Sequence, residues 1–369
     1  MIYGDICLPG FFADAAFRAA VLGDVYEAQT LDLEGFKANC PADSPFAQLS
    51  PAKDATAGVI ILRALPEIAR KRLDFAHAIF GGAAISAAFP MGQMIHYTGQ
   101  SGPDEPLFAQ EALQSDTLRI YARALQELMH YFARPSLRFA ELAQRFPVIC
   151  ARAASQLRAQ APRPRTISTA HSREDIIVKD QRLPYSNFFA VEESDLSFKT
   201  YGGAQSAVIT RAGFLQCDAV TVLPFDPVRD CVLLVEQFRF GPFIRGDANP
   251  WSLEPIAGRV DPGEGPEEAA HREASEEAQL SLKSLHKIAQ YYPSPGAVSE
   301  YLYSYLAIAD LPDDIEGIAG LASEAEDIRS LRLPFAALMA LIESGEINNG
   351  PLIMSAQWLA ANRARLRRV

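Results

Sequence analysis

The stretch GRVDPGEGPEEAAHREASEEAQL, from Gly258 to Leu280, combines a dense group of carboxylates with one arginine. Glu273, Glu276 and Glu277 are spaced i, i+3 and i+4, which places them on one face of a helix. Three carboxylates on one face repel each other, so the arrangement costs free energy at neutral pH unless a cation is bound. Hard divalent cations such as Mg²⁺ use oxygen-rich sites completed by water and substrate phosphates. The spacing therefore indicates a phosphate-cleaving metal site, and a solvated acidic helix is the alternative.

The residues before this group favour a helix that begins at Pro266. Proline suits the first helical turn, where its missing N–H would have no partner. Glu267 and Glu268 complement the positive end of the helix dipole. Arg272 directly precedes Glu273 and can orient a carboxylate through a bidentate pair. The sequence thus predicts a helix whose acidic face carries its own organising cation.

A longer register frames the acidic face, and it is set by Gly258, Glu264, Arg272, Glu273, Glu276, Glu277 and Leu280. It resembles the Nudix hydrolase signature G-x5-E-x7-R-E-U-x-E-E-x-G-U, in which U is a bulky aliphatic residue. Two positions depart, since Ala274 is small for its place and Gln279 replaces the last glycine. That glycine is structural, so we expect Gln279 to alter the helix exit and leave the metal site intact. The resemblance also implies that Glu264 braces the loop before the helix.

The resemblance implies a reaction, a fold and a set of ligands. Nudix enzymes hydrolyse a nucleoside diphosphate linked to another moiety, with Mg²⁺ or Mn²⁺, and fold as an α/β/α sandwich around a mixed sheet. Carried onto this chain, the metal ligands would be Glu273, Glu277 and the carbonyl of Ala257. Glu276 would act through a water, and Arg272 would orient the carboxylates. Such a site neutralises diphosphate oxygens and activates a water for in-line attack.

The segments VLLVEQFRFGPF, WSLEPIAG, YYPSPGAVSEYLYSYLA, SEAEDIRSLRLP and GEINNGPLIMSAQWL extend the likeness over residues 187–359. They resemble ADP-ribose pyrophosphatases, which implies cleavage of ADP-ribose to AMP and ribose 5-phosphate. Pro295 lies fifteen positions after Leu280, where ADP-ribose-cleaving members carry a proline. Glu324 and Glu326 match the acidic loop that supplies a candidate catalytic base, and Glu326 would also contact the metal.

The candidates for substrate binding each have a structural alternative. Arg239 and Glu254 either bind the ribose or adenine or form a structural ion pair. Pro295 either contacts the ligand or only forms a turn with Gly296. Glu300 either contacts the ligand or ends a strand.

Composition narrows the class of protein. The chain has 369 residues, of which 49% are hydrophobic and 21% charged, with a formal net charge of -11. This length favours two domains, and the acidic charge is a poor match for nucleic acid or anionic lipid. No apolar run approaches the roughly 18 residues of a membrane span, and the first residues lack signal-peptide features. Five widely spaced cysteines without a CxxC pair indicate reduced thiols in a cytoplasm.

The opening segment IYGDICLPGFF resembles the start of γ-glutamylcyclotransferase-like domains, and this likeness covers residues 1–110. It implies a small mixed α+β barrel. Asp5 replaces the small hydroxyl residue of the loop, and His77 aligns with the proton-shuttling glutamate of that family. We therefore expect the fold without cyclotransferase activity. Fusions of this fold with an ADP-ribose-type Nudix domain occur among proteins labelled tellurite-resistance.

The expected fold class is α+β and α/β, in three parts. Residues 1–110 form the cyclotransferase-like domain, residues 111–165 a helical extension ending in the linker QAPRPRT, and residues 166–369 the Nudix domain. ADP-ribose pyrophosphatases of this type are homodimers that exchange N-terminal strands. The segment FFAVEESDLSFKTYGG matches those strands, so the resemblance implies a homodimer.

Three other functions compete with an Mg²⁺-dependent ADP-ribose pyrophosphatase. The same chemistry could act on another nucleotide sugar or on NADH. A non-hydrolytic Nudix sensor could bind ADP-ribose and report it to a partner, although the metal-ligand glutamates and Arg272 are all present. The N-terminal part could instead be the active enzyme, and His77 argues against that.

Overall fold

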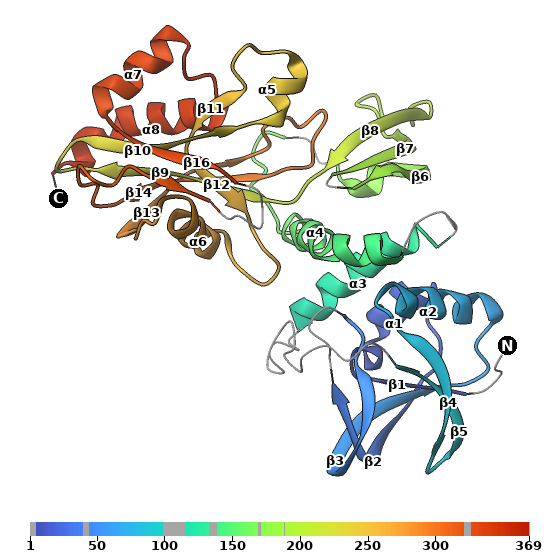
Figure 1. The fold of residues 1–369 in the computed structure, drawn as a ribbon. Helices are drawn as coiled ribbons and strands as arrows, with labels where there is room; N and C mark the ends of the chain where they lie inside the picture. Colours follow the sequence, from blue (N-terminus) through green and yellow to red (C-terminus); the bar gives the residue numbers. More distant parts are fainter. Residues whose placement is uncertain are drawn as a thin grey trace. The chain divides into compact units, whose positions relative to one another are not determined.

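The computed structural model in Figure 1 describes residues 5–39, 44–98, 115–132, 139–168, 171–187, 189–320 and 326–368. The chain divides into two compact units, Met1–Arg211 and Ala212–Val369. Each unit combines helices with a mixed sheet, which confirms the predicted α+β class. No helix among the described residues has both the length and the apolar character needed to span a membrane.

The first unit begins with a five-stranded sheet of order β2-β3-β1-β5-β4. Its strands are β1 (Ile6–Pro9), β2 (Gln29–Asn39), β3 (Gln48–Leu62), β4 (Ala83–Phe89) and β5 (Gly92–Thr98). Strands β1 and β5 are parallel and the other pairs are antiparallel. The sheet is therefore mixed, as predicted, but the described strands include no pairing of β2 with β4 that would close a barrel.

Helices accompany this sheet: η1 (Gly10–Ala13), α1 (Ala15–Leu22), α2 (Glu67–Ile79), α3 (Ser115–Met129) and α4 (Phe139–Arg158). Helix α1 ends at Gly23, whose φ of 91° is the left-handed conformation that glycine adopts at low cost. Helices α3 and α4 lie within residues 111–165, where the sequence predicted a helical extension.

A short 3-10 turn, η3 (Arg173–Asp175), leads into a three-stranded sheet of β6 (Ile176–Ser186), β7 (Ala190–Phe198) and β8 (Ile209–Leu215). Strand β8 continues across the division into the second unit. Strands β6 and β7 are antiparallel. Apolar side chains of β6 remain exposed, with Ile176, Ile177 and Val178 between 42% and 49% accessible.

The second unit is built on an eight-stranded mixed sheet with the path β13-β14-β9-β10-β16-β15. Its strands are β9 (Ala219–Asp226), β10 (Cys231–Phe238), β11 (Trp251–Glu254), β12 (Ile256–Arg259), β13 (Ser284–Tyr291), β14 (Leu302–Ile308), β15 (Ile318–Ala319) and β16 (Ile328–Pro334). Strand β11 pairs with β10 and β12 with β9. Strands β9 and β10 form an antiparallel hairpin, in which Cys231 pairs with Asp226. Strand β14 runs parallel to β9, and this pairing makes the sheet mixed.

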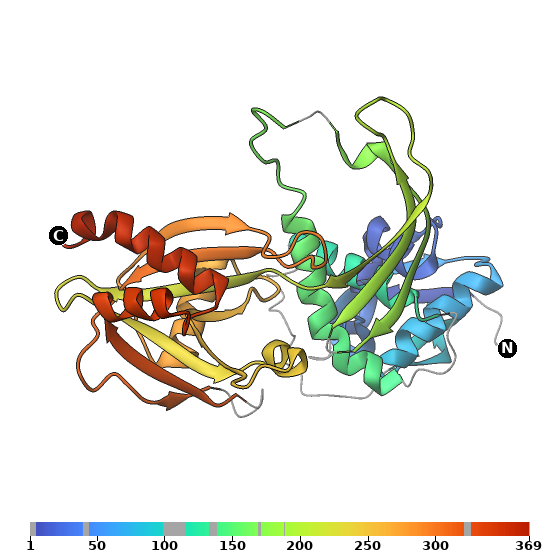
Figure 2. The same ribbon diagram turned by 90° about the horizontal axis from the view of Figure 1, so that it is seen from above.

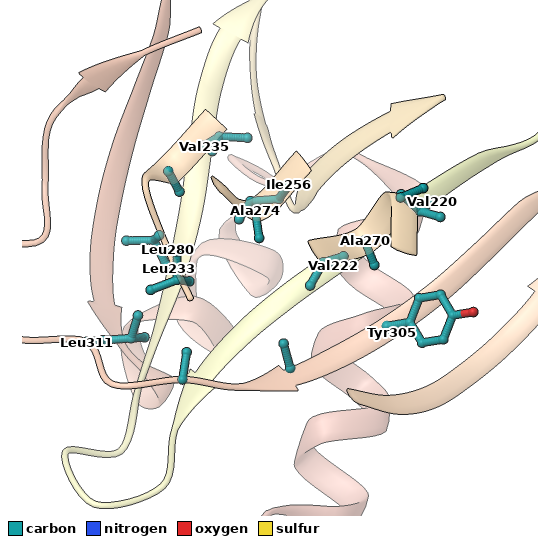
Figure 3. Packing of buried hydrophobic residues seen from close by; sticks show 14 of the residues in the cluster. Val220, Val222, Leu233, Val235, Ile256, Ala270, Ala274, Leu280, Tyr305 and Leu311 are labelled. Carbon is teal, nitrogen blue, oxygen red and sulfur yellow. The ribbon is translucent and has the colours of Figure 1, made fainter. Parts of the chain in front are cut away.

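Helices cover both faces of this sheet, as Figure 1 shows. They are α5 (Phe240–Arg245), α6 (Pro266–Ala278), α7 (Phe335–Ser344) and α8 (Gly350–Leu366). Alternate residues of a strand point to opposite faces. Val220 and Val222 accordingly pack with Ala270 of α6 (Figure 3), whereas Leu223 packs in the core formed with α7 and α8. Figure 2 shows α7 and α8 lying together over the strands.

This arrangement confirms the α/β/α sandwich. The face of α6 that meets the sheet consists of alanines, including Ala270 and Ala274 (Figure 3). Small side chains let a helix approach its sheet closely without leaving voids. Ala274, which departs from the signature, is fully buried in this contact.

The cysteines in the described residues, Cys7, Cys150, Cys217 and Cys231, are free and buried. Cys40 lies outside the described residues. Burial raises the pKa of the Cys7 thiol to about 11, which keeps it protonated and unreactive at neutral pH.

Candidate active site

Helix α6 begins and ends where its sequence predicts. Pro266 is its first residue, and the Glu268 side chain accepts a hydrogen bond of 2.7 Å from the Gly265 N–H. At the other end, Gln279 has φ 51°, and the N–H of Leu280 donates to the carbonyl of Ala274. This left-handed closure explains the glycine of the signature, because residues other than glycine adopt it at a cost. Gln279 thus bears that strain at the helix exit.

Arg272 is the centre of the acidic group. Its guanidinium donates to Glu264 at 2.8 and 3.3 Å, to Glu273 at 2.8 Å and to Glu276 at 3.0 Å. A fourth partner, at 2.9 Å, is the carbonyl oxygen of Arg259 on β12. One planar cation thus fixes three carboxylates and ties α6 to the sheet.

Glu264 braces the turn before the helix. Its Oε1 accepts a hydrogen bond of 2.7 Å from the backbone N–H of Asp261 while its carboxylate also pairs with Arg272. The geometry is the one implied by the resemblance, and it links the loop conformation to the orientation of the acidic face.

Two carboxylates of α6 lie against the backbone of β12. A Cβ added to Gly258 would lie 1.8 Å from Oε1 of Glu273, so any side chain at this position would displace the carboxylate. One residue earlier, the N–H of Ala257 donates to Oε2 of Glu277 at 3.2 Å. The glycine of the signature is therefore required for close approach of Glu273 to the strand.

Both of these glutamates are buried, and burial changes their acidity. Glu273 is 9% exposed and Glu277 only 2%. Burial, together with repulsion from Glu276 and Glu326, raises the pKa of Glu273 to about 7 against the lowering influence of Arg272. Burial raises the pKa of Glu277 to about 8, with added repulsion from Glu273 and Glu326. A cation at this point would relieve both the desolvation and the repulsion.

These residues fit a hard divalent cation. Among the described residues, no three His, Cys, Asp or Glu side chains are grouped so that they could hold a metal ion by themselves. Mg²⁺ typically binds through one or two carboxylates and completes its shell with water and substrate phosphates. The buried pair Glu273 and Glu277 beside the backbone of β12 supplies that partial shell.

Arg239 forms an ion pair with Glu254. Its guanidinium donates to the carboxylate of Glu254 at 2.6 and 3.0 Å, and Glu254 is 5% exposed. The charge of Arg239 also acts on Glu277 and Glu326. Burial raises the pKa of Glu300, and the charge of Arg239 opposes that rise. The fold therefore places four predicted acids around Arg239, namely Glu254, Glu277, Glu300 and Glu326.

The remaining predicted residues lie in loops. Pro295 is exposed within a turn closed by the N–H of Ala297, which donates to the carbonyl of Ser294 at 3.0 Å. Glu300 precedes β14 and is partly buried. Glu324 lies outside the described residues.

An exposed aromatic group flanks Arg239 and was not singled out from the sequence. The Phe238 ring lies 5.7 Å from that of Trp251 and 6.0 Å from that of Phe243, between ring centres. Phe238 is 45% and Trp251 53% exposed. Three phenylalanines in FRFGPF were the available signal, because aromatic faces exposed beside charged groups are typical of ligand sites.

Comparison with known proteins agrees with this geometry. Residues 215–355 match the sequence model of the NUDIX domain. The ADP-ribose pyrophosphatase of Haemophilus influenzae is 35% identical over 197 residues, which are 53% of this chain and 90% of that protein. The chain belongs to the Nudix family.

Other relatives of this Nudix chain are named for ADP-ribose or for another nucleotide sugar. The ADP-ribose pyrophosphatase of Escherichia coli K12 is 32% identical over 205 residues, covering 56% of this chain and 97% of that protein. A GDP-mannose pyrophosphatase of Escherichia coli is 32% identical over 142 residues, covering 38% and 73%. A solved structure described as an ADP compounds hydrolase is 25% identical with a TM-score of 0.40, covering 52% of this chain and 98% of that one.

The raised pKa of Glu277 predicts how the cation-free Nudix domain responds to pH. The folded protein holds this proton up to about pH 8, whereas the ordinary value is 4.5. The folded state therefore binds more protons between those values, and the free energy of unfolding falls as pH rises through them. Glu277→Gln removes this effect and can still accept the Ala257 hydrogen bond. We expect it to stabilise the cation-free protein by about 1–3 kcal/mol at pH 8 and by much less at pH 5.

Thermal unfolding in EDTA at the two pH values measures this difference. Glu267→Gln is the matched control, because Glu267 is exposed on the same helix. Equal destabilisation by Glu277→Gln at both pH values would contradict the assignment of a buried, protonated carboxyl.

Proposed function

We propose that the Nudix domain hydrolyses the diphosphate of ADP-ribose to AMP and ribose 5-phosphate. The observation that carries this proposal is the pair of buried glutamates, Glu273 and Glu277, held against β12 by Arg272 and by a backbone N–H. Relatives named ADP-ribose pyrophosphatase align over nearly their whole length with this region. The buried glutamates and these relatives together favour diphosphate cleavage over a purely structural role for the acidic helix.

A divalent cation, Mg²⁺ or Mn²⁺, would be held by Glu273, Glu277 and the carbonyl of Ala257, with Glu326 as a further ligand. When bound it would neutralise diphosphate oxygens and acidify a water. Glu276 would contact it through a water. The charges of Glu326 and the two buried glutamates already act on one another, as a shared cation would require.

The chain's own residues orient the reactants and move the proton. Arg272 keeps the Glu273 carboxylate fixed, and Glu324 or Glu326 takes the proton of the attacking water. The water oxygen bonds to one phosphorus as the bond from that phosphorus to the bridging oxygen breaks. AMP and ribose 5-phosphate leave, each carrying one phosphate.

Substrate binding would use the group around Arg239. This arginine, its partner Glu254 and Glu300 would bind the ribose or adenine, with Pro295 in the adjoining loop. The exposed rings beside Arg239, including Trp251, offer faces on which a purine can stack.

Other substrates are a second candidate. The GDP-mannose pyrophosphatase relative favours another nucleotide sugar, and NADH carries the same diphosphate linkage. A sensor that binds ADP-ribose without cleaving it is disfavoured, because Arg272 and both buried glutamates are in place.

Turnover of a substrate panel tests the proposal. With Mg²⁺, the full-length protein should release AMP from ADP-ribose faster than nucleotide from GDP-mannose or NADH, and EDTA should abolish the reaction. Glu277→Gln should lower kcat/KM by about 100-fold or more while the protein stays folded. Glu267→Gln, on the exposed side of the same helix, should retain activity. Absence of AMP release from ADP-ribose would refute the substrate assignment.

The cyclotransferase-like assignment of residues 1–110 is also a proposal, without cyclotransferase activity. His77 is buried, and burial lowers its pKa to about 3, so it is a weak base at neutral pH. Its ring stacks on Tyr97 at 4.0 Å and lies 4.3 Å from Phe46. The adjoining cavity, of about 10 Å³, holds about one water. Release of 5-oxoproline from a γ-glutamyl substrate would contradict this proposal.

The buried, free thiols suit a reducing cytoplasm.

A homodimer through β6 and β7 is the proposed assembly. Exposed apolar residues on consecutive positions of β6, such as Ile176 and Ile177, leave both faces of the strand to be covered. Ile177→Asp should convert a dimer to a monomer in sedimentation, whereas Lys179→Gln on the same strand should not. A monomeric wild type at micromolar concentration would exclude this assembly.

A further inference from the structure

A cavity of about 640 Å³ lies within the first unit. Its wall is formed by α1, by the segment that leads into β2 and by the end of β3. The residues that carry its chemistry are Arg18, Val25, Tyr26, Gln29, Ile61 and Arg63. None of them serves the proposed diphosphate hydrolysis, and His77 lines a separate cavity. The volume is in the range of about 300–1,000 Å³ that is typical of small-molecule sites.

Arg18 is the feature that needs a ligand. It is only 9% exposed, and its Nη1 donates to the carbonyl oxygens of Phe12 at 2.7 Å and Ala13 at 2.8 Å. No described residue accepts a hydrogen bond from its Nε. Within the described part of the chain, no carboxylate forms an ion pair with this guanidinium. A buried cation without a counter-charge is costly, because protein interiors normally pair or neutralise buried charge.

Arg63 brings a second positive charge to the same cavity. Its side chain is 64% exposed and is held by an ion pair with Asp5 at 3.7 Å and a hydrogen bond to Gln29 at 3.3 Å. Contacts of this length and exposure are weak, so Arg63 can turn toward a ligand at little cost. Two guanidinium groups on one wall provide the planar donors that carboxylates and phosphates prefer.

The other lining residues restrict what can bind. Glu27 adds one negative charge, but it is exposed and forms no ion pair with Arg18. Tyr26 contributes a phenol. Val25 and Ala28 supply apolar surface. The combination suits an anion with an organic part more than a bare inorganic ion.

We propose that this cavity binds a small organic anion, whose carboxylate or phosphate group pairs with Arg18 and Arg63. Its organic part would lie against Val25 and Ala28. The site is independent of the Nudix reaction, so its failure would leave the proposed hydrolysis unaffected.

Calorimetric titration of the full-length protein, passed over a chelating resin that removes divalent cations, tests the proposal, because the Nudix site depends on such a cation. Two probes distinguish the anion: glycerol phosphate for a phosphate monoester and glutarate for a carboxylate. We expect saturable binding of one of them. Arg63→Gln should weaken it about tenfold or more, since a charge-assisted hydrogen bond is lost. Val25→Trp, which fills the cavity from an exposed position, should abolish it.

Controls keep the outcome decisive. Arg18→Met removes a guanidinium that also holds the Phe12 and Ala13 carbonyls, so loss of folding in that variant would not bear on the proposal, and the other two variants decide. Arg119→Gln, an exposed arginine of α3 paired with Asp116, should bind like wild type. Failure of both probes to bind, or binding unchanged in Arg63→Gln and Val25→Trp, would overturn the proposal.

Discussion

The ion-pair network of Arg272 is the interaction on which the site depends. One guanidinium joins the turn before α6, through Glu264, to the acidic face of the helix, through Glu273 and Glu276. It also reaches the carbonyl of Arg259, so the helix cannot shift relative to β12 without breaking it. The carboxylates are therefore held in place before any ligand arrives, and preorganisation of this kind is a large part of how enzymes stabilise charge.

This arrangement buries the carboxyl groups of Glu273 and Glu277, and burial disfavours their charged forms. The alanine face of α6 brings the helix close to the sheet, and Gly258 lets Glu273 approach the strand itself. Close approach removes water from Glu273 and Glu277, and both carboxyls become weak acids. A cation-free site is thus unfavourable above neutral pH, and a divalent cation offsets this cost. The same packing that stabilises the sandwich makes the site depend on a cation.

The sequence predicted the features that depend on local spacing. Helix α6, its acidic face and the Arg272 pairing follow from the spacing of the residues, and the α/β/α layers were implied by the resemblance to the Nudix signature. Gln279 was expected to alter only the helix exit, and its positive φ agrees with that. Features that depend on contacts between distant segments could not be predicted in the same way. The burial of Glu277 against β12 and the order of the described strands in the first sheet are of this kind.

The proton balance of cation binding tests most directly whether the buried glutamates are the cation site. Calorimetric titration of Mg²⁺ into the protein at pH 7, in buffers of different ionisation enthalpy, gives the number of protons released. At this pH a carboxyl with a pKa of about 7 is about half protonated and one with a pKa of about 8 is mostly protonated, and both must ionise to bind the cation. Release of about one proton per cation, reduced in Glu277→Gln, is the predicted result. Binding without proton release, or with release unchanged in Glu277→Gln, would contradict it.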